Sequence, residues 1–500
     1  MVSVQTPDWV KDAVFYQIFP DRFARSAALQ ASKPSHLEAW DAPPTRLGYK
    51  GGDLLGVAEH LAHIQDLGAT AIYFCPIFQA TANHRYHTHD YYVVDPLLGG
   101  NAAFRTLLDE AHRRGIRVVL DGVFNHVSRG FFYFNDILEN GSNSPYLDWF
   151  TIHSFPLNAY DETRPPGYSA WWGLRQLPRL NTDNAGAREY IMKVGEYWLR
   201  QGIDGWRLDV PHEISAAGFW EEFRTRVKAI NRDAYIVGEI WNDATPYLQG
   251  DRFDGVMNYL FTSATLGFAG GDRIVPAMVE GKGYNPREPM PGTAYAERLN
   301  WLLGLYPWEI QLTQMNLLDS HDTARAISIF GGDAASVRLA TLLLMTFPGA
   351  PCIFAGDEIG QEGGVPDSDA RRSFPWDHPE AWHNGVLAYH RALIALRRTH
   401  RPLRRGTFQS LYADEDTIVF ARRFSGDVLI VAANRGNAAR RIEIPVNDLY
   451  LTASSVEVVF PRLEVMTWGA FEGGGATGRV VDGKLSLDLA PRSGVVLKAA

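Results

Sequence analysis

The chain has 500 residues, which is enough for roughly two or three domains. Because 46% of the residues are hydrophobic and 21% charged, it is not a disordered protein. Its formal net charge of -9 argues against nucleic acid or an anionic membrane surface as the main partner, because both attract basic proteins. The first residues lack the basic start and apolar run of a signal peptide, and no apolar stretch is long enough to span a bilayer, so we expect a cytoplasmic protein. Cys75 and Cys352 each lie in an apolar run, which predicts buried thiols rather than a disulfide or a metal site.

Short runs rich in Val, Ile, Phe and Tyr alternate with longer segments of helical period, which is typical of repeated βα units. Residues 54–67 repeat apolar side chains at every third or fourth position, and residues 103–114 do so ahead of Gly115, which is expected to end the helix. Parallel strands joined by such helices close into a (β/α)8 barrel. We predict its strands at residues 13–20, 71–78, 117–124, 205–210, 235–240, 254–259, 314–318 and 351–355.

Two regions depart from this repeat. Residues 125–182 form a long insertion after the third strand, with turn-forming stretches such as residues 141–145, and insertions of this length are more often functional than idle. From residue 401 onward, alternating apolar residues are separated by Gly, Asn and Asp turns, which predicts an all-β domain. We therefore divide the chain into a barrel of residues 1–124 and 183–400, an insertion subdomain of residues 125–182 and a C-terminal domain of residues 401–500.

Three acidic residues, Asp209, Glu239 and Asp322, come at the polar ends of predicted strands, which meet on one face of a parallel barrel. Hydrolysis of a glycosidic bond with retention needs a carboxylate below the anomeric carbon and a carboxylic acid at the leaving oxygen, about 5 to 5.5 Å apart. Asp209 suits the first role, because it alternates in phase with Arg207, whose guanidinium would keep it ionised and oriented. Glu239 suits the second role. A single Asp at a strand end could instead cap a helix, but three in ordered motifs favour catalysis.

Ordered motifs resemble the four signature regions of the α-amylase family of glycoside hydrolases, at residues 121–126 (DGVFNH), 205–213 (GWRLDVPHE), 238–241 (GEIW) and 318–322 (LDSHD). Residues 177–181 (LPRLN) and 51–54 (GGDL) resemble the neopullulanase, cyclomaltodextrinase and maltogenic amylase branch. The resemblance runs from about residue 10 to the end of the chain. It implies a (β/α)8 TIM barrel with an insertion subdomain after the third strand and a C-terminal β-sandwich.

The resemblance also implies roles for residues around the three acids. Asp322 would bind sugar hydroxyls and stabilise the positively charged transition state, as a fixed negative charge can do by electrostatic preorganisation. His126 and His321 would hydrogen-bond the sugar that is cleaved, although either histidine alone could be structural. Tyr86 would stack on the same sugar ring. His87 stands where the family commonly has Asp, so the polar contacts of this loop differ from those of relatives.

Further binding residues follow from the same motifs. Asp121 would support Arg207. Asp367 and Arg371 match a pair that grips the next sugar toward the nonreducing side, although their spacing of four residues also suits a local surface ion pair. On the leaving-group side the sequence departs from the usual Ala-Asn-Glu, and the expected contacts there are His212, Glu213 and Trp241.

The sequence gives less information about metal binding and oligomeric state than about the catalytic residues. The histidines of residues 84–89 could mimic a metal site, but they lack a second spaced ligand set. The Asn/Asp-rich calcium loop of some relatives is not evident at residues 25–43, so we predict no obligatory metal, with calcium left open. The branch usually carries an amino-terminal β-sandwich that builds its dimer, and here the first strand begins by residue 13, so the oligomeric state stays undecided.

Together these features predict a retaining α-glucan hydrolase that cleaves α-1,4 bonds in maltooligosaccharides, cyclodextrins or pullulan, with transfer to sugar acceptors in competition with water. An α-glucosidase and a glucosyl transferase, such as a trehalose-forming enzyme, are alternatives within the family. A noncatalytic carbohydrate-binding homologue is the alternative from another class. The presence of all three acids disfavours the noncatalytic alternative.

Overall fold

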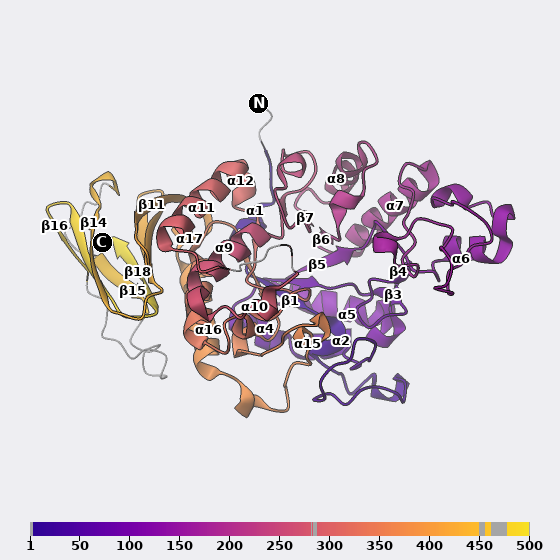
Figure 1. The fold of residues 1–500 in the computed structure, drawn as a ribbon, viewed down its shortest axis with the longest axis horizontal. Helices are drawn as coiled ribbons and strands as arrows, with labels where there is room; N and C mark the ends of the chain where they lie inside the picture. Colours follow the sequence, from indigo (N-terminus) through magenta and orange to yellow (C-terminus); the bar gives the residue numbers. More distant parts are fainter. Residues whose placement is uncertain (1–3, 282, 284–287, 450–455, 462–477, 500) are drawn as a thin grey trace.

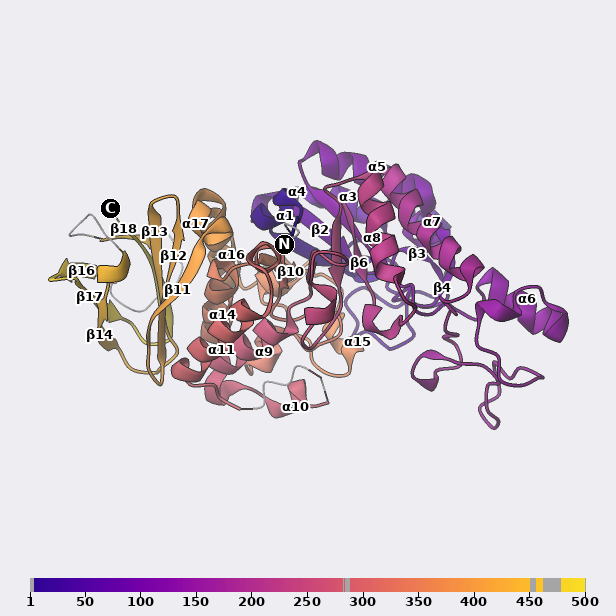
Figure 2. The same cartoon turned by 90° about the horizontal axis from the view of Figure 1, so that it is seen from above.

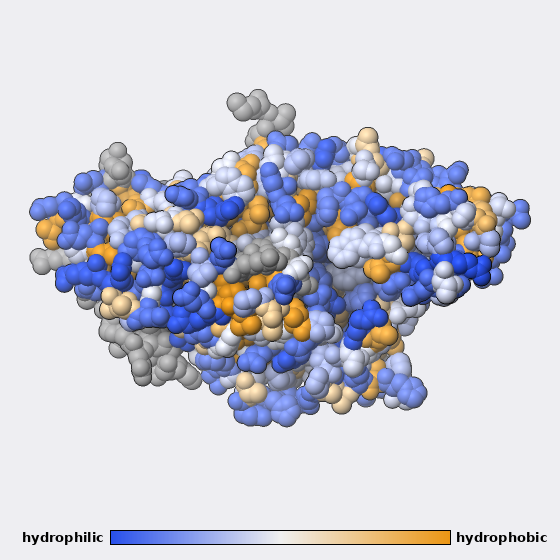
Figure 3. All heavy atoms as spheres, viewed as in Figure 1, coloured by the Kyte–Doolittle hydropathy of each residue, from blue (hydrophilic) through white to orange (hydrophobic). Residues whose placement is uncertain are grey.

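The computed structural model of the chain describes residues 4–281, 283, 288–449, 456–461 and 478–499. A barrel occupies its centre, a segment of helix and loop lies at one end, and antiparallel sheets lie at the opposite end (Figures 1 and 2). The face shown in Figure 3 is mostly hydrophilic, with small hydrophobic patches near its centre. Across the described residues, no helix has the length and apolar character needed to cross a membrane.

Eight parallel strands form the barrel and follow one another in chain order. A bridge between Met257 and Met315 joins the last pair of neighbours and closes the ring. The predicted barrel is confirmed, although most strands are shorter than the apolar runs that predicted them, because those runs continue into buried loops. The strands are β1 (Phe15–Ile18), β2 (Ala71–Phe74), β5 (Arg117–Gly122), β6 (Gly205–Leu208), β7 (Tyr235–Gly238), β8 (Gly255–Val256), β9 (Met315–Asn316) and β10 (Ala350–Phe354).

Helices cover the outside of the barrel (Figure 2). The predicted helix at residues 54–67 is two helices, α3 (Leu54–Glu59) and α4 (Leu61–Leu67), because His60 departs from helical geometry with φ -106° and ψ 10°. The second predicted helix corresponds to α5 (Gly100–Arg113), and Gly115 follows it with a φ of 73°, which glycine adopts without strain. Other helices are α1 (Asp8–Asp12), α2 (Pro20–Phe23), α7 (Ala185–Gln201), α8 (Phe219–Ile230), α9 (Tyr259–Gly270), α10 (Pro276–Val279), α11 (Gly292–Leu305), α12 (Trp308–Gln311), α13 (Ala326–Ile329), α14 (Ala334–Thr346), α15 (Asp367–Ala370), α16 (Asn384–Thr399) and α17 (Arg401–Arg405).

Two segments inserted between barrel strands supply side chains to the site. β3 (Phe78–Ala80) and β4 (Thr88–Val94) form a short antiparallel pair that the sequence did not predict, and Tyr86 lies in the loop between them. The segment of residues 125–182 contains α6 (Phe132–Asn140) and otherwise consists of turns and isolated bridges. Figure 1 shows α6 at the end of the molecule remote from the C-terminal sheets.

The C-terminal region consists of a five-stranded and a three-stranded antiparallel sheet, which confirms the predicted all-β fold. In β12 (Thr417–Phe424), Ile418 and Phe420 pack toward the helices that surround the barrel, whereas Val419 and Ala421 pack toward the smaller sheet. A strand covered on both faces has a near-continuous apolar sequence. The division of the chain at residues 124, 182 and 400 stays a prediction. The other strands are β11 (Thr407–Ala413), β13 (Asp427–Asn434), β14 (Arg440–Pro445), β15 (Val456–Phe460), β16 (Gly478–Val481), β17 (Lys484–Leu489) and β18 (Ser493–Ala499).

Candidate active site

Three carboxylates lie side by side at the carboxyl ends of adjacent barrel strands. Asp121 is the second-to-last residue of β5, and Asp209 and Glu239 directly follow β6 and β7. The backbone N–H of Asp209 donates to the carbonyl of Gly122, and that of Glu239 to the carbonyl of Leu208, so both acids continue the ladder of the sheet. Because all strands are parallel, these residues converge on one face of the barrel.

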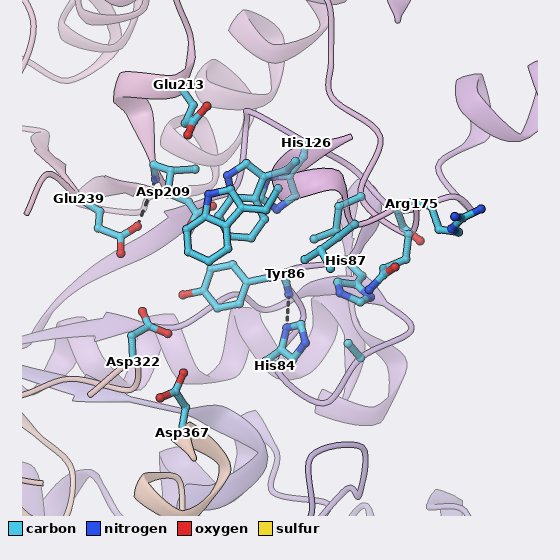
Figure 4. Close-up of a pocket in the computed structure, with 18 of the residues that line it drawn as sticks. His84, Tyr86, His87, His126, Arg175, Asp209, Glu213, Glu239, Asp322 and Asp367 are labelled. Atoms are coloured by element: carbon cyan, nitrogen blue, oxygen red, sulfur yellow. Dashed lines mark hydrogen bonds between the residues drawn. The ribbon is translucent and has the colours of Figure 1, made fainter. Parts of the chain in front are cut away.

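Arg207 is the centre of this group. Its Nη1 lies 2.9 and 3.0 Å from the two carboxylate oxygens of Asp121 and 3.0 Å from Oδ1 of Asp209, and its Nη2 lies 2.8 Å from Oε2 of Glu239. The predicted alternation of Arg207 and Asp209 is confirmed, since both side chains point to the same side of β6. One guanidinium therefore bridges Asp209 and Glu239, which places the two carboxyl groups around a single small space (Figure 4).

The buried group holds more negative than positive charge. Burial raises the pKa of Asp209 well above its ordinary value, and the charge of Glu239 raises it further, against the opposing effect of Arg207. Burial also raises the pKa of Asp121 to about 6. Arg207 therefore lowers the pKa of Asp209 as expected, but burial and the charge of Glu239 outweigh it, so the guanidinium alone does not keep Asp209 ionised. A site of this kind can supply both a proton donor and an ionised carboxylate.

Glu239 is held by donors on both sides of its carboxyl group. The backbone N–H of Val210 donates to Oε2 at 3.2 Å, and the indole N–H of Trp241 donates to Oε1 at 3.0 Å. Val210 has a φ of 35° and a ψ of 50°, a left-handed conformation that is costly for a β-branched residue. Trp241 stacks on Tyr259 with ring centroids 4.0 Å apart. These contacts fix the side chain of Glu239 at the edge of the cleft.

Asp322 faces the first three acids from the loop after β9. Its carboxylate lies 3.0 Å from Nη2 of Arg371 and 3.0 Å from Nε2 of His321. Asp367, whose spacing suggested a local ion pair with Arg371, is 3.9 Å from the same Nη2. Arg371 therefore contacts Asp322 more closely than its helical neighbour, and it joins α15 to the site rather than forming a surface pair.

Tyr86 connects the two halves of the site. Its hydroxyl donates to Oδ2 of Asp121 at 2.9 Å and lies 2.6 Å from Nε2 of His321. The rings of Tyr86 and His321 are parallel, with centroids 5.5 Å apart. Tyr86 lines the cleft, whereas Asp121, Arg207 and His321 lie fully buried beneath its floor. These three buried residues contact other side chains of the site, and their predicted contacts with sugar stay predictions.

His126 forms part of the cleft wall together with the insertion. It stacks on Trp171, with centroids 4.8 Å apart, and Trp171 stacks in turn on the exposed Trp172. Burial lowers the pKa of His126 to about 3, so the ring is neutral under ordinary conditions. Its Nε2 is buried and has no hydrogen-bond partner among the described residues. A buried polar atom of this kind needs a partner, which a sugar hydroxyl in the cleft could provide.

The cleft has a volume of about 1570 Å³, above the range of about 300 to 1,000 Å³ that is common for small-molecule sites. Loops from most of the barrel contribute to it, together with the insertion. The predicted site residues on its surface are Tyr86, His126, Asp209, His212, Glu213, Glu239, Trp241, Asp322, Asp367 and Arg371. The structure thus brings together all ten of them around the acids shown in Figure 4.

The histidine-rich loop does not gather into a ligand set. His84 and His87 have ring centroids 4.9 Å apart, and Nδ1 of His84 accepts a hydrogen bond from the backbone N–H of Tyr86 at 3.1 Å. Burial lowers the pKa of His87 to about 4. Within the described part of the chain, no three His, Cys, Asp or Glu side chains lie close enough to hold a metal ion.

Sequence reasoning missed several residues that shape the site. Gln17 in β1 contacts His321, and the hydroxyl of Tyr73 in β2 donates to Asp121 at 3.0 Å. Both lie in runs that were interpreted only as buried strands. Trp171 is part of the loop-rich insertion. The polar Gln17 inside an apolar strand was the one signal that could have singled out a residue of this set.

The geometry agrees with three comparisons. Residues 17–382 match the family described as "Alpha amylase, catalytic domain". The chain is 43% identical to a cyclomaltodextrinase of Geobacillus thermopakistaniensis over 89% of this chain and 72% of that protein, and 42% identical to neopullulanase 2 of Thermoactinomyces vulgaris over 83% and 68%. A crystal structure of the debranching enzyme of Nostoc punctiforme is 52% identical, with a TM-score of 0.88 over 99% of this chain and 100% of that chain. The chain therefore belongs to the α-amylase family of glycoside hydrolases.

Proposed function

We propose that this protein is a retaining α-glucan hydrolase in which Asp209 is the nucleophile, Glu239 the acid and base, and Asp322 the third catalytic carboxylate. The observation that carries this proposal is the single buried guanidinium of Arg207, which contacts both Asp209 and Glu239. Two carboxyl groups held around one small space suit a double displacement.

The reaction would proceed in two steps. Asp209 attacks the anomeric carbon while Glu239 gives its proton to the leaving glycosidic oxygen, so that a covalent glycosyl-enzyme forms and a shortened glucan leaves. Glu239, now ionised, takes a proton from water or from a sugar hydroxyl, whose oxygen displaces Asp209 with a second inversion. Asp322 lies across the cleft, where its negative charge would stabilise the oxocarbenium-like transition state.

The substrates we propose are maltooligosaccharides, cyclodextrins and pullulan, cleaved mainly at α-1,4 bonds and with some transfer to sugar acceptors. Support comes from the names of the relatives, a cyclomaltodextrinase and a neopullulanase. Hydrolysis of α-1,6 bonds is a second candidate, favoured by the 52% identity to a protein named a debranching enzyme. An α-glucosidase would act one glucose at a time, and a trehalose-forming transferase would give a nonreducing product.

We further propose that catalysis needs no metal cofactor, with calcium as the ion to test, and that no nucleic acid or membrane takes part. A cytoplasmic location is supported by the two cysteines, which are both buried free thiols, as is usual in reducing compartments.

The proposal is tested by incubating the purified protein with maltotetraose, β-cyclodextrin and pullulan and following the products by chromatography and by NMR of the anomeric protons. α-Configured first products are expected from retention. From pullulan, panose would indicate α-1,4 cleavage and maltotriose α-1,6 cleavage. Binding without turnover would favour the noncatalytic alternative and contradict the proposal.

Glu239→Gln is expected to abolish turnover while oligosaccharide binding persists, because the amide keeps the shape of the side chain but has no acidic proton to transfer. The matched control is Glu213→Gln, a second acid on the same cleft, which should retain hydrolysis and change only the acceptor preference. Equal losses in the two variants would remove Glu239 from the acid role.

A further inference from the structure

A buried glutamine lies directly below the candidate catalytic residues. Gln17 is in β1, and its side chain is fully buried within the barrel. Its amide nitrogen is 2.7 Å from Nδ1 of His321 and 3.4 Å from the thiol sulfur of Cys75. The amide oxygen is buried and has no hydrogen-bond partner among the described residues. The nitrogen of the amide therefore faces His321, although leaving the amide oxygen buried and unpaired is costly.

The opposite nitrogen of His321 contacts two residues of the site. Nε2 is 2.6 Å from the hydroxyl of Tyr86 and 3.0 Å from Oδ2 of Asp322. The single proton of the Tyr86 hydroxyl is donated to the carboxylate of Asp121, so the hydroxyl oxygen can only accept from the histidine. An ionised Asp322 also requires a donor. Both contacts therefore need the proton of His321 on Nε2.

In a neutral imidazole with its proton on Nε2, Nδ1 is an acceptor and needs a donor. The amide N–H of Gln17 is that donor, and the reversed amide would set its oxygen against the lone pair of Nδ1. We propose that Gln17 is a positioning residue that fixes the tautomer of His321, and thereby orients Asp322 and Tyr86 for catalysis. The catalytic part of this inference rests on the proposed function, whereas the tautomer does not.

Charged and titratable groups contact His321 from several sides. These groups include Tyr86, Asp322 and Arg371, whose Nε donates to the His321 carbonyl at 2.6 Å. Asp121 acts through Tyr86, and the thiol of Cys75 accepts from the amide of Gln17. A negative charge placed at residue 17 would therefore act directly on the imidazole, through the 2.7 Å contact with Nδ1.

Gln17→Glu tests this directly, because it keeps the size of the side chain and replaces the donor with an acceptor. The carboxylate would draw a proton onto Nδ1 and raise the pKa of His321. Below that pKa the imidazolium still has its Nε2 proton, so activity on maltotetraose persists. Above that pKa the remaining proton stays on Nδ1 beside the carboxylate. We expect kcat/KM to gain a new alkaline limb there, with a loss of about tenfold or more, the equivalent of one charge-assisted hydrogen bond.

Gln17→Met removes the donor without adding charge, so activity should fall at every pH and no new limb should appear. The control is Gln314→Met. Gln314 is also buried in the barrel, but at the opposite, amino-terminal end of β9, where its amide oxygen accepts from the backbone N–H of Val256 at 2.9 Å. This variant should be less stable and should keep the wild-type pH profile. A wild-type profile in Gln17→Glu would overturn the proposal.

The tautomer of His321 can be measured in the absence of substrate. In protein labelled with 15N-histidine, the ring nitrogens of His321 should show the Nε2-protonated neutral form in the wild type and both nitrogens protonated in Gln17→Glu. The His321 signals are assigned by their disappearance in His321→Asn. An Nδ1-protonated wild type would refute the role of Gln17. If the protein hydrolysed no glucan but showed the expected tautomer, only the proposed function would fail.

Discussion

Replacing Arg207 with methionine removes the fully buried positive charge that contacts Asp121, Asp209 and Glu239 at separations of 2.8 to 3.0 Å. Removing one partner of a buried ion pair costs about 3 to 5 kcal/mol, because the other charge stays buried and uncompensated. If the roughly 400 residues that precede the C-terminal sheets unfold together, an unfolding entropy of about 2.1 cal/mol/K per residue gives roughly 0.8 kcal/mol/K. We therefore expect the midpoint of thermal unfolding to fall by about 4 to 6 °C near neutral pH.

The loss should depend on pH in a defined direction. The folded-state pKa values of Asp121 and Asp209 already lie above their ordinary range, and they would rise further without Arg207. A raised carboxyl pKa gives stability that is present at low pH and is lost as pH rises through the folded-state value. The difference between wild type and variant should therefore be small near pH 4 to 5 and grow as pH passes about 6, the pKa of Asp121. Thermal unfolding followed by circular dichroism across this range measures it.

Arg226→Met is a matched control. Arg226 contacts Glu189, Glu196 and Glu222 at 2.6 to 3.4 Å, but about a third of its side chain is exposed, so its loss should cost at most about 1 kcal/mol. If Arg207→Met lowered the midpoint by less than about 1 °C, or if its effect shrank as pH rose, the reasoning about uncompensated buried charge would be wrong.

Three further outcomes are expected. Asp319→Asn should lessen the loss of stability as pH rises above the ordinary carboxyl range, because burial and the charge of Asp357 raise the pKa of Asp319 and its stabilising proton is lost as pH rises. If the melting temperatures of the two proteins depended on pH in the same way, this explanation would be wrong. Trp171→Ala should raise KM for maltotetraose by about two- to tenfold with little change in kcat, since it removes the ring that stacks on His126. A fall in kcat alone would exclude that explanation. Dialysis against EDTA should leave melting temperature and activity unchanged, and restoration of lost activity by calcium would show that the predicted independence of metal is wrong.

The sequence was most informative where a local pattern decides the structure. Alternating apolar runs and helical segments predicted the barrel, because burial on both faces and connection by helices constrain each unit separately. The spacing of Arg207 and Asp209 placed both on one side of β6, since side chains alternate along a strand. The break at His60 and the pairing of β3 with β4 escaped prediction because propensity alone does not locate such local departures.

By itself, the sequence determined which barrel strands form and which acids stand at their ends. Only the tertiary structure decided that Arg207 bridges Asp209 and Glu239, that Trp171 covers His126 and that Gln17 reaches His321. Gln17 and His321 lie 304 residues apart in the chain, and their contact depends on how the whole barrel closes rather than on any pattern near either residue. Contacts of this kind arise from close packing among distant segments, which local periodicity does not encode.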